Sequence, residues 1–266
     1  MEDRTMSVAG SFYPANEHEI LAMIEHFNTI LSSHPDALHR FELLKGNAII
    51  VPHAGWIYSG FTANIAFRVL KNTHPKTIVV IGPSHRVGFN GASIADMESY
   101  QTPLGSLTIN RNLTKDLMQR LGLSYYPDAH HEHSTEVQMP FIKHYFPDVN
   151  VIEIVYAYSE PSQIEPIIAY CLNQGDVAVV ISTDLSHYYS LEQANQIDEI
   201  CLEAIRDKNT LELHQGCEAC GIIGVEAMLN VAKKKGLKST ILDYRTSADA
   251  SGDSARVVGY VSALFQ

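Results

Sequence analysis

The chain has 266 residues, of which 45% are hydrophobic and 18% are charged. This composition is typical of a globular protein with a large apolar core. The formal net charge is −11, from 19 Lys and Arg against 30 Asp and Glu. Such a balance argues against a nucleic-acid partner and against an anionic membrane surface, because both require a basic face. The basic run Lys233-Lys234-Lys235 falls at the end of a predicted helix, where cations complement the helix dipole.

The N-terminal residues Met1–Ala15 contain acidic side chains from the start and lack the apolar segment of a signal peptide. The longest apolar stretches have the length of strands and are too short to span a membrane. Cysteines 171, 201, 217 and 220 do not resemble a disulfide framework in a chain of this length. We therefore expect reduced thiols and a cytoplasmic location.

Apolar β-branched runs alternate with amphipathic segments along the chain. In chain order we expect a helix over Glu17–Leu31, a strand over Ala48–Val51, a helix over Thr62–Leu70, a strand over Thr77–Ile81, helices over Thr114–Leu121 and Glu136–Tyr145, a strand over Val149–Val155, a helix over Gln163–Cys171, a strand over Val177–Ile181, helices over Leu191–Arg206 and Gly221–Lys235, and strands over Ser239–Leu242 and Val257–Leu264. Continuous Val and Ile runs indicate strands buried on both faces. The sequence thus predicts a three-layer α/β/α fold with a mixed, mostly parallel central sheet. No linker or repeat interrupts it, so we expect a single domain over residues 1–266.

Three of the predicted strands are each followed closely by a histidine. His53 follows Ala48–Val51, His85 follows Thr77–Ile81, and His187 comes six residues after Ile181. In open α/β sheets the ligand site lies in loops at the carboxyl ends of the strands. Imidazole is also the commonest metal ligand at neutral pH. A lone histidine in such a loop is more often a solvated residue than a ligand, but three at equivalent positions favour a metal site.

The peptide Asp128–Glu136 carries further polar side chains. It can be read as a solvated loop that ends in a helix cap, with Ser134 or Thr135 as the capping residue and Glu136 in the first turn. It can equally be read as a loop that points His133 and Glu136 into the same cleft as the strand-end histidines. The residues alone do not separate these readings.

Cys217 and Cys220 form a Cys-x-x-Cys pair without a second such pair, so a structural four-thiolate zinc site is weakly supported. Cys220 comes directly before the predicted helix Gly221–Lys235. A thiolate at a helix N-terminus is stabilised by the helix dipole and would be a strong, soft metal ligand. The simpler alternative is a small buried apolar residue.

A serine hydrolase is the natural competitor, because Ser84, Ser182 and Ser186 lie near histidines and Asp184 in the sequence. However, the peptide around Ser84 lacks the second glycine of the Gly-x-Ser-x-Gly nucleophile elbow. The sequence contains neither a P-loop nor a strand-linked Gly-x-Gly-x-x-Gly motif, so a nucleotide cofactor has no support.

Taken together, the polar peptides resemble the Memo family. The matching peptides appear in family order and span essentially the whole chain: Ala9–Pro14, Val51–Gly60, Gly82–His85, Glu132–Glu136, Ser182–His187, Cys220–Gly224 and the closing segment Ser251–Leu264. Each motif is loose, but the ordered set is highly specific.

The resemblance implies a fold related to the class III extradiol (LigB-like) dioxygenases, which hold non-haem iron between two histidines and a glutamate. His53 and His85 match the two histidine ligands, and His187 matches the acid/base histidine. Cys220 falls where those enzymes carry the glutamate. Because a thiolate favours softer metals than a carboxylate does, Cu or Zn²⁺ competes with the otherwise favoured Fe²⁺, and ring-cleaving activity does not carry over. Related proteins also imply a radical-SAM protein as a partner.

These expectations lead to three hypotheses. The first is a metal-dependent redox enzyme in which His53, His85 and Cys220 bind one ion, His187 transfers protons under the control of Asp184, and His133 and Glu136 support the site. The second is a protein that binds a peptide or a partner without turnover on an enzyme-like scaffold. The third is a metal-assisted hydrolase with Glu136 or His187 as the base.

Overall fold

The structure is a computed structural model that describes residues 3–266. The first two residues of the expected domain, Met1 and Glu2, lie outside the described residues. The strands are β1 (Ala48–Val51), β2 (Thr77–Pro83), β3 (Ala92–Ile94), β4 (Ser99–Tyr100), β5 (Leu107–Ile109), β6 (Asn150–Tyr156), β7 (Val177–Ser182), β8 (His187–Tyr189), β9 (Ser239–Thr246) and β10 (Val257–Phe265). The helices are α1 (Glu17–Ser32), α2 (Pro35–Leu43), α3 (Trp56–Leu70), α4 (Arg111–Leu121), α5 (His133–Glu136), α6 (Met139–Tyr145), α7 (Pro161–Leu172), α8 (Leu191–Asp207), α9 (Thr210–Leu213), α10 (Ile222–Lys235) and α11 (Ala248–Ser251), with 3₁₀ turns η1 (Lys71–Thr73) and η2 (Pro127–His130).

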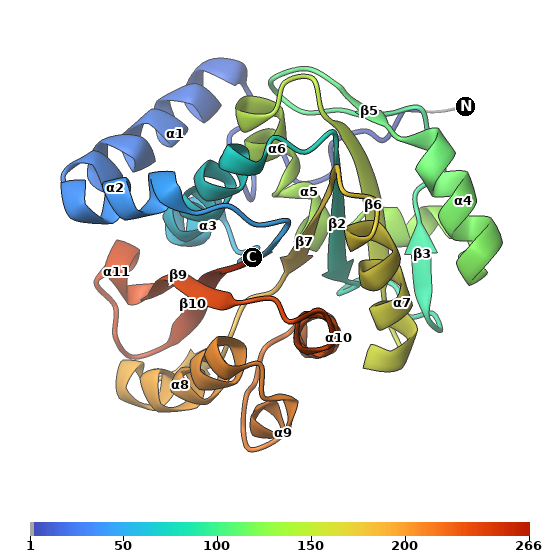
Figure 1. The fold of residues 1–266 in the computed structure, drawn as a ribbon. Helices are drawn as coiled ribbons and strands as arrows, with labels where there is room; N and C mark the ends of the chain where they lie inside the picture. Colours follow the sequence, from blue (N-terminus) through green and yellow to red (C-terminus); the bar gives the residue numbers. More distant parts are fainter. Residues whose placement is uncertain (1–2) are drawn as a thin grey trace.

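Within residues 3–266, ten strands form one mixed sheet (Figure 1). Its order is β4-β5-β6-β2-β7-β1-β10-β8, with β3 paired to β6 and β9 paired to β10. The neighbours β5, β6, β2, β7 and β1 run parallel, and the other pairings are antiparallel. The sheet therefore has a parallel centre and antiparallel flanks.

Helices cover both faces of this sheet. Alternate residues of β1 point to opposite sides: Ile49 and Val51 join a core cluster with α1, α2, α3 and α6, whereas Ala48 and Ile50 join one with α4, α7, α8 and α10. This alternation follows from the pleat of a strand, and burial of each Val or Ile contributes about 1.5–3 kcal/mol. The predicted three-layer α/β/α fold is confirmed.

All of the predicted strands and helices are present, with some changed boundaries. The helix expected over Thr62–Leu70 begins earlier, at Trp56. The helix expected over Glu136–Tyr145 is instead divided into α5 and α6, and Pro140 lies in the first turn of α6, where its missing N–H costs nothing. The cap of α5 is Glu132, whose side chain accepts from two backbone N–H groups, rather than Ser134 or Thr135.

The expectation of reduced thiols is wrong for one pair of cysteines. Cys201, in α8, and Cys217 form a disulfide with a Cα–Cα distance of 5.0 Å, while Cys171 and Cys220 are free. The expectation rested on chain length and on the lack of an export signal, neither of which reports that the fold brings these two residues together.

No helix within the described residues combines the length and the apolar character needed to span a membrane.

The strand order brings the loops that carry the candidate site residues to one edge of the sheet. β7 lies between β2 and β1, with Val51 beside Ser182 and Ile81 beside Ile181. Because the three strands are parallel and in register, their carboxyl ends meet at the same edge of the sheet. The loops that carry His53, His85 and Asp184 therefore emerge next to one another.

Candidate metal centre

Three side chains with metal-binding atoms converge at the carboxyl edge of the sheet. The ligand atoms of His53, His85 and Cys220 all lie within 4.8 Å of one another. The His53 and His85 ring centroids are 5.1 Å apart, with the rings edge to face. His53 follows β1 and His85 follows β2, the two strands on either side of β7, and Cys220 is the residue before the N-cap of α10.

Hydrogen bonds fix which nitrogen of His53 faces the other ligands. The Ser182 hydroxyl donates its one proton to the Ser134 carbonyl oxygen at 2.5 Å, so its oxygen is left to accept from His53 Nδ1 at 3.0 Å and from Gln138 Nε2 at 3.1 Å. Nδ1 therefore carries the proton. The lone pair is on Nε2, which lies 3.2 Å from Cys220 Sγ. Burial, followed by the charges of nearby histidines, also lowers the pKa of His53 well below its ordinary value, so the ring is neutral and able to bind a metal.

Cys220 is held over the strand ends by a close approach of α10 to β7. A Cβ added at Gly221 would lie 2.8 Å from the Ser182 carbonyl oxygen and 2.7 Å from Thr183 Cβ, so only glycine fits there. The backbone N–H of Asp184 donates to Cys220 Sγ at 3.2 Å. The expected thiolate is absent from the metal-free chain, because burial and then Asp184 raise the pKa of Cys220 to about 12. A metal ion bound at the sulfur must therefore displace a proton.

His85 is oriented by Glu132, a fully buried carboxylate. Glu132 Oε2 accepts from the His85 backbone N–H at 2.6 Å, and Oε1 lies 3.4 Å from His85 Nδ1. The same Oε1 lies 2.6 Å from His133 Nδ1, as an ion-pair contact without aligned hydrogen-bond geometry. Although burial acts to raise it, these imidazoles and the backbone N–H groups hold the pKa of Glu132 well below its usual range. The negative charge of an ionised Glu132 favours a proton on the Nδ1 of His85, and that tautomer leaves Nε2 for a metal.

His133 completes a group of three imidazoles. Its ring centroid is 4.7 Å from that of His85 and 5.4 Å from that of His53, and Phe12 packs on it at 4.5 Å. His85, Glu132 and His133 also form a second set of potential ligands within 4.8 Å of one another. The structure thus brings His133 beside the metal-binding atoms.

Asp184 and His187 lie close to this centre, but they do not form the expected pair. Asp184 Oδ1 accepts from the backbone N–H of His53 at 2.7 Å and of Ala54 at 3.3 Å, and Oδ2 is 4.0 Å from His53 Nε2. Burial raises the pKa of Asp184, and the charge of a protonated His187 acts on both Asp184 and His53. No hydrogen bond joins Asp184 to His187 in the described part of the chain.

Glu136 points to a different set of partners. Its carboxylate accepts from the backbone N–H groups of Ser7 and Val8 and from the Tyr13 hydroxyl, each at 2.8 Å. It also forms a buried ion pair with Arg4 at 3.0 Å. These contacts attach the N-terminal segment to the α5 region, and they leave Glu136 outside both sets of potential ligands.

A cavity of about 410 Å³ opens beside the centre. Its lining includes His85 and Cys220, the half-buried Ile223, and the exposed Arg86 and Tyr158. A small ligand in this cavity would reach two of the three metal-binding side chains.

Comparison with known proteins supports the resemblance seen in the sequence. The family described as Memo-like protein matches residues 4–264. The chain belongs to the Memo family. It is 30% identical to a MEMO1 family protein of Aquifex aeolicus over 276 residues, covering 100% of both chains. It is 31% identical to MEMO1 family proteins of Methanobrevibacter smithii, covering 99% of each chain, and of Thermotoga petrophila, covering 98% of this chain and 99% of the relative.

The residues of this Memo protein fit a metal ion. With metal–nitrogen and metal–sulfur bonds of about 2.1 and about 2.3 Å, ligands of one ion lie about 3.1 Å apart at a right angle and about 3.6 Å apart at the tetrahedral angle. The distance of 3.2 Å between His53 Nε2 and Cys220 Sγ falls within this range. A metal ligand needs a nitrogen without a proton, and His53 already offers one at Nε2 because its proton is on Nδ1.

Sequence reasoning missed the residues that orient the ligands in this Memo protein. Glu132, Ser182 and Gln138 are fully buried, and each bonds to a ligand or to its support. The cap position of Glu132 could not be read from the sequence, because the predicted helix began at Glu136 and the observed α5 begins at His133. Gln138 Nε2 also donates a hydrogen bond to the Pro52 carbonyl oxygen, and nothing in the sequence predicts this contact.

Proposed function

We propose that this Memo-family protein binds one metal ion through His53, His85 and Cys220 and catalyses a redox reaction on a small molecule in the adjoining cavity. The observation that carries the proposal is the convergence of three ligand atoms within 4.8 Å, from two strand ends and one helix start. Structural zinc sites use four protein ligands, whereas three leave a coordination position for a substrate.

The donor set narrows the choice of metal. Two imidazoles and one thiolate suit Fe²⁺, Cu⁺ and Zn²⁺, and do not suit Mg²⁺ or Ca²⁺, which prefer oxygen ligands. Iron is favoured by the resemblance to non-haem dioxygenases. A bound redox-active ion would supply the electron transfer of the reaction.

The chain's own groups position the ligands and manage protons. Ser182 holds the proton on His53 Nδ1, and Glu132 holds the proton on His85 Nδ1. Cys220 Sγ gives up a proton when the ion binds. His187, half-buried near His53 and Asp184, is the proposed proton donor and acceptor for the substrate.

Metal analysis of anaerobically purified protein tests the proposal. The protein is reconstituted separately with Fe²⁺, Cu⁺ and Zn²⁺, and bound metal is measured after desalting. We expect one ion per chain in the parent protein and loss of tight binding in a His53→Ala/His85→Ala variant and in Cys220→Ser. The control is His18→Ala/His39→Ala, which removes two exposed histidines. Equal, substoichiometric metal in all variants would overturn the proposal.

Two further assays separate redox chemistry from the alternatives. Oxygen uptake and product formation on catechol and thiol panels are expected only in the metal-loaded parent protein. Chelator-sensitive hydrolysis of ester or amide substrates with Zn²⁺ would instead support a hydrolase. Metal-independent capture of a peptide without any turnover would support a binding protein. Glu136 is not proposed as a base, because its carboxylate is occupied by Arg4 and the N-terminal segment.

A further inference from the structure

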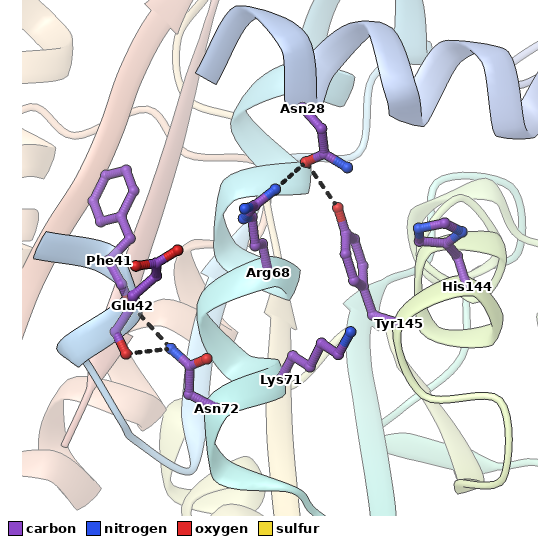
Figure 2. A pocket seen from close by; sticks show the side chains of 8 residues that line it. All are labelled: Asn28, Phe41, Glu42, Arg68, Lys71, Asn72, His144 and Tyr145. Carbon is purple, nitrogen blue, oxygen red and sulfur yellow. Dashed lines mark hydrogen bonds between the residues drawn. The ribbon is translucent and has the colours of Figure 1, made fainter. Parts of the chain in front are cut away.

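A second cavity, of about 400 Å³, lies on the α1–α2–α3–α6 side of the molecule (Figure 2). It lies near the amino ends of the parallel strands, whereas the metal centre lies at their carboxyl ends. The helix α3 joins the two regions: it begins three residues after His53 and ends next to Lys71. Its fifteen residues span about 22 Å, so the second cavity is separate from the metal centre.

Three potential cations line this cavity. Arg68 donates from Nη1 to Asn28 Oδ1 at 3.0 Å, which leaves its remaining N–H groups available. Lys71 Nζ lies 6.0 Å from the centroid of the Tyr145 ring. His144 packs edge to face on the same ring at 4.6 Å. Within residues 3–266, none of the three forms an ion pair with a carboxylate.

Arg68 and Lys71 therefore line one cavity without an ion pair to a carboxylate in the described structure. Burial and then the Lys71 ammonium lower the pKa of His144, and Glu25 acts in the opposite direction. This arrangement occurs in a chain whose net charge is −11. Cations often gather at helix C-termini because they complement the dipole. That effect explains Arg68 and Lys71 on α3 and η1, but it does not explain why both meet His144 of α6 at one cavity.

The side-chain oxygens of Asn28 and Asn64, next to Arg68, already accept hydrogen bonds. Asn28 Oδ1 accepts from Asn64 Nδ2 at 3.0 Å as well as from Arg68, and Asn64 Oδ1 accepts from the Tyr145 hydroxyl at 2.7 Å. Figure 2 shows Arg68 and Tyr145 directed at the same Asn28 side chain, with Lys71 below them. The wall thus presents unused donors on Arg68 and Lys71, and its unused acceptors lie on the α2 side, at Glu42 and Asn72.

We infer that this cavity binds the phosphate group of a small phosphorylated molecule. A planar guanidinium can donate two parallel hydrogen bonds to phosphate oxygens, and an ammonium adds a point charge. His144 can add a further donor when a dianion approaches, since an anion favours the protonated ring. The cavity volume lies within the usual range for small-molecule sites.

Glu42 is the one carboxylate among the residues that line this cavity. It lies on the α2 side, and it forms no ion pair with Arg68 or Lys71 in the described structure. Its charge opposes a bound anion. Removal of that charge should therefore strengthen binding, which provides a test of opposite sign to the removal of a cation.

Calorimetric titration with inorganic phosphate and with glycerol phosphate tests this inference, on the protein as purified and after chelator treatment. We expect saturable binding that survives chelation, with Kd raised about tenfold in Lys71→Gln, about tenfold in Arg68→Lys and lowered in Glu42→Gln. Lys115→Gln, which removes an exposed charge on α4, should leave Kd unchanged. Tighter binding of glycerol phosphate than of phosphate would identify an organic phosphate as the ligand class, and equal binding would identify free phosphate.

Three results would overturn the inference. They are the absence of saturable binding at millimolar phosphate, loss of binding on chelation, and equal Kd values for Lys71→Gln and the parent protein. None of these results bears on the metal proposal, which is tested by different variants and a different readout. Thermal unfolding of each variant without ligand shows whether it is folded.

Discussion

At the scale of single residues, Glu132 shows how one buried carboxylate can orient two imidazoles. It accepts from the backbone N–H groups of His85 and His133, and its Oε1 lies near Nδ1 of both rings. Desolvation of a carboxylate is costly unless hydrogen bonds and nearby positive charge compensate for it. The lowered pKa of Glu132 indicates that its surroundings do compensate. An ionised Glu132 in turn favours the His85 tautomer that a metal needs.

We predict that Glu132→Gln weakens metal binding about 10- to 100-fold, the usual effect of losing a carboxylate that supports a metal-bound histidine. Glutamine keeps the side-chain length and one acceptor oxygen, but it removes the charge. The change is measured by competition with a chromophoric chelator. Glu192→Gln, at an exposed position in the first turn of α8, is the control.

The Glu132→Gln substitution should change the ligand field of the bound metal as well as the metal affinity. The visible spectrum of the Co²⁺-substituted variant should differ from that of the parent protein, because the His85 ring is less constrained. A variant that lost stability alone would bind metal weakly and yet keep the parental spectrum at saturation. Parental affinity in Glu132→Gln would contradict the assigned role.

At the scale of elements, regular periodicity made the sheet and its covering helices predictable. Continuous apolar runs such as Val177–Ile181 identify the buried strands. Once the strands are placed, the histidines just after their carboxyl ends can be located as well. The two- and three-residue strands β3, β4, β5 and β8 were not predicted, because segments so short carry no measurable alternation. The pairing of Cys201 with Cys217 also depends on tertiary packing.

The sequence predicted those site residues that come directly after a clearly predicted strand. It did not predict features that depend on contacts between distant elements. Position after a strand singled out His53, His85 and His187, and the resemblance to the Memo family then assigned His53 and His85 as the metal ligands. The state of the Cys220 sulfur was not predicted, because its burial beside Asp184 outweighs the helix dipole that the sequence suggested. The engagement of Glu136 by Arg4 joins residues 132 positions apart, and nothing local in the sequence indicates it.

The approach of α10 to β7 yields a prediction at this scale. A methyl group in Gly221→Ala would lie 2.8 Å from a backbone oxygen that cannot move without distorting β7. We expect α10 to shift and to carry Cys220 away from His53, with at least a tenfold loss of metal affinity and destabilisation of about 1–3 kcal/mol. Metal competition and urea unfolding measure the two effects.

Gly55→Ala is the matched control for that variant. Gly55 is only two residues from His53, but a Cβ there meets its nearest neighbour, the Phe12 carbonyl oxygen, at an ordinary 3.7 Å. It should retain metal affinity within about twofold, a free-energy change of roughly 0.4 kcal/mol. Equal behaviour of the two alanine variants would show that the close packing at Gly221 does not position the sulfur.

At the scale of the whole molecule, the two edges of the sheet have different chemistry. The carboxyl edge holds imidazoles, a thiol and buried carboxylates, and the cavity near the amino ends is lined by Arg68 and Lys71 among mostly neutral residues. A metal ion that binds only the folded chain stabilises the entire fold by mass action. Protonation at the carboxyl edge should therefore be visible in the stability of the whole protein.

The sign of that pH dependence follows from Cys220. In the metal-free fold the pKa of Cys220 is about 12, above its ordinary value of 9.0, so the thiol keeps its proton throughout the neutral range. A raised pKa in the folded state contributes stability below the ordinary value and loses it as the pH rises toward 12. Metal binding acts in the opposite direction, because the ion displaces this proton and is favoured at higher pH.

We predict that metal affinity rises about tenfold per pH unit between about pH 7.5 and about pH 9, the slope for release of one proton. His53 adds no proton to this slope, because its lowered pKa leaves it neutral there. The increase in Tm caused by saturating metal should grow over the same range. Calorimetry in buffers of different ionisation enthalpy counts the protons directly. In Cys220→Ser the slope should fall toward zero, and a parental slope in that variant would show that the displaced proton comes from another group.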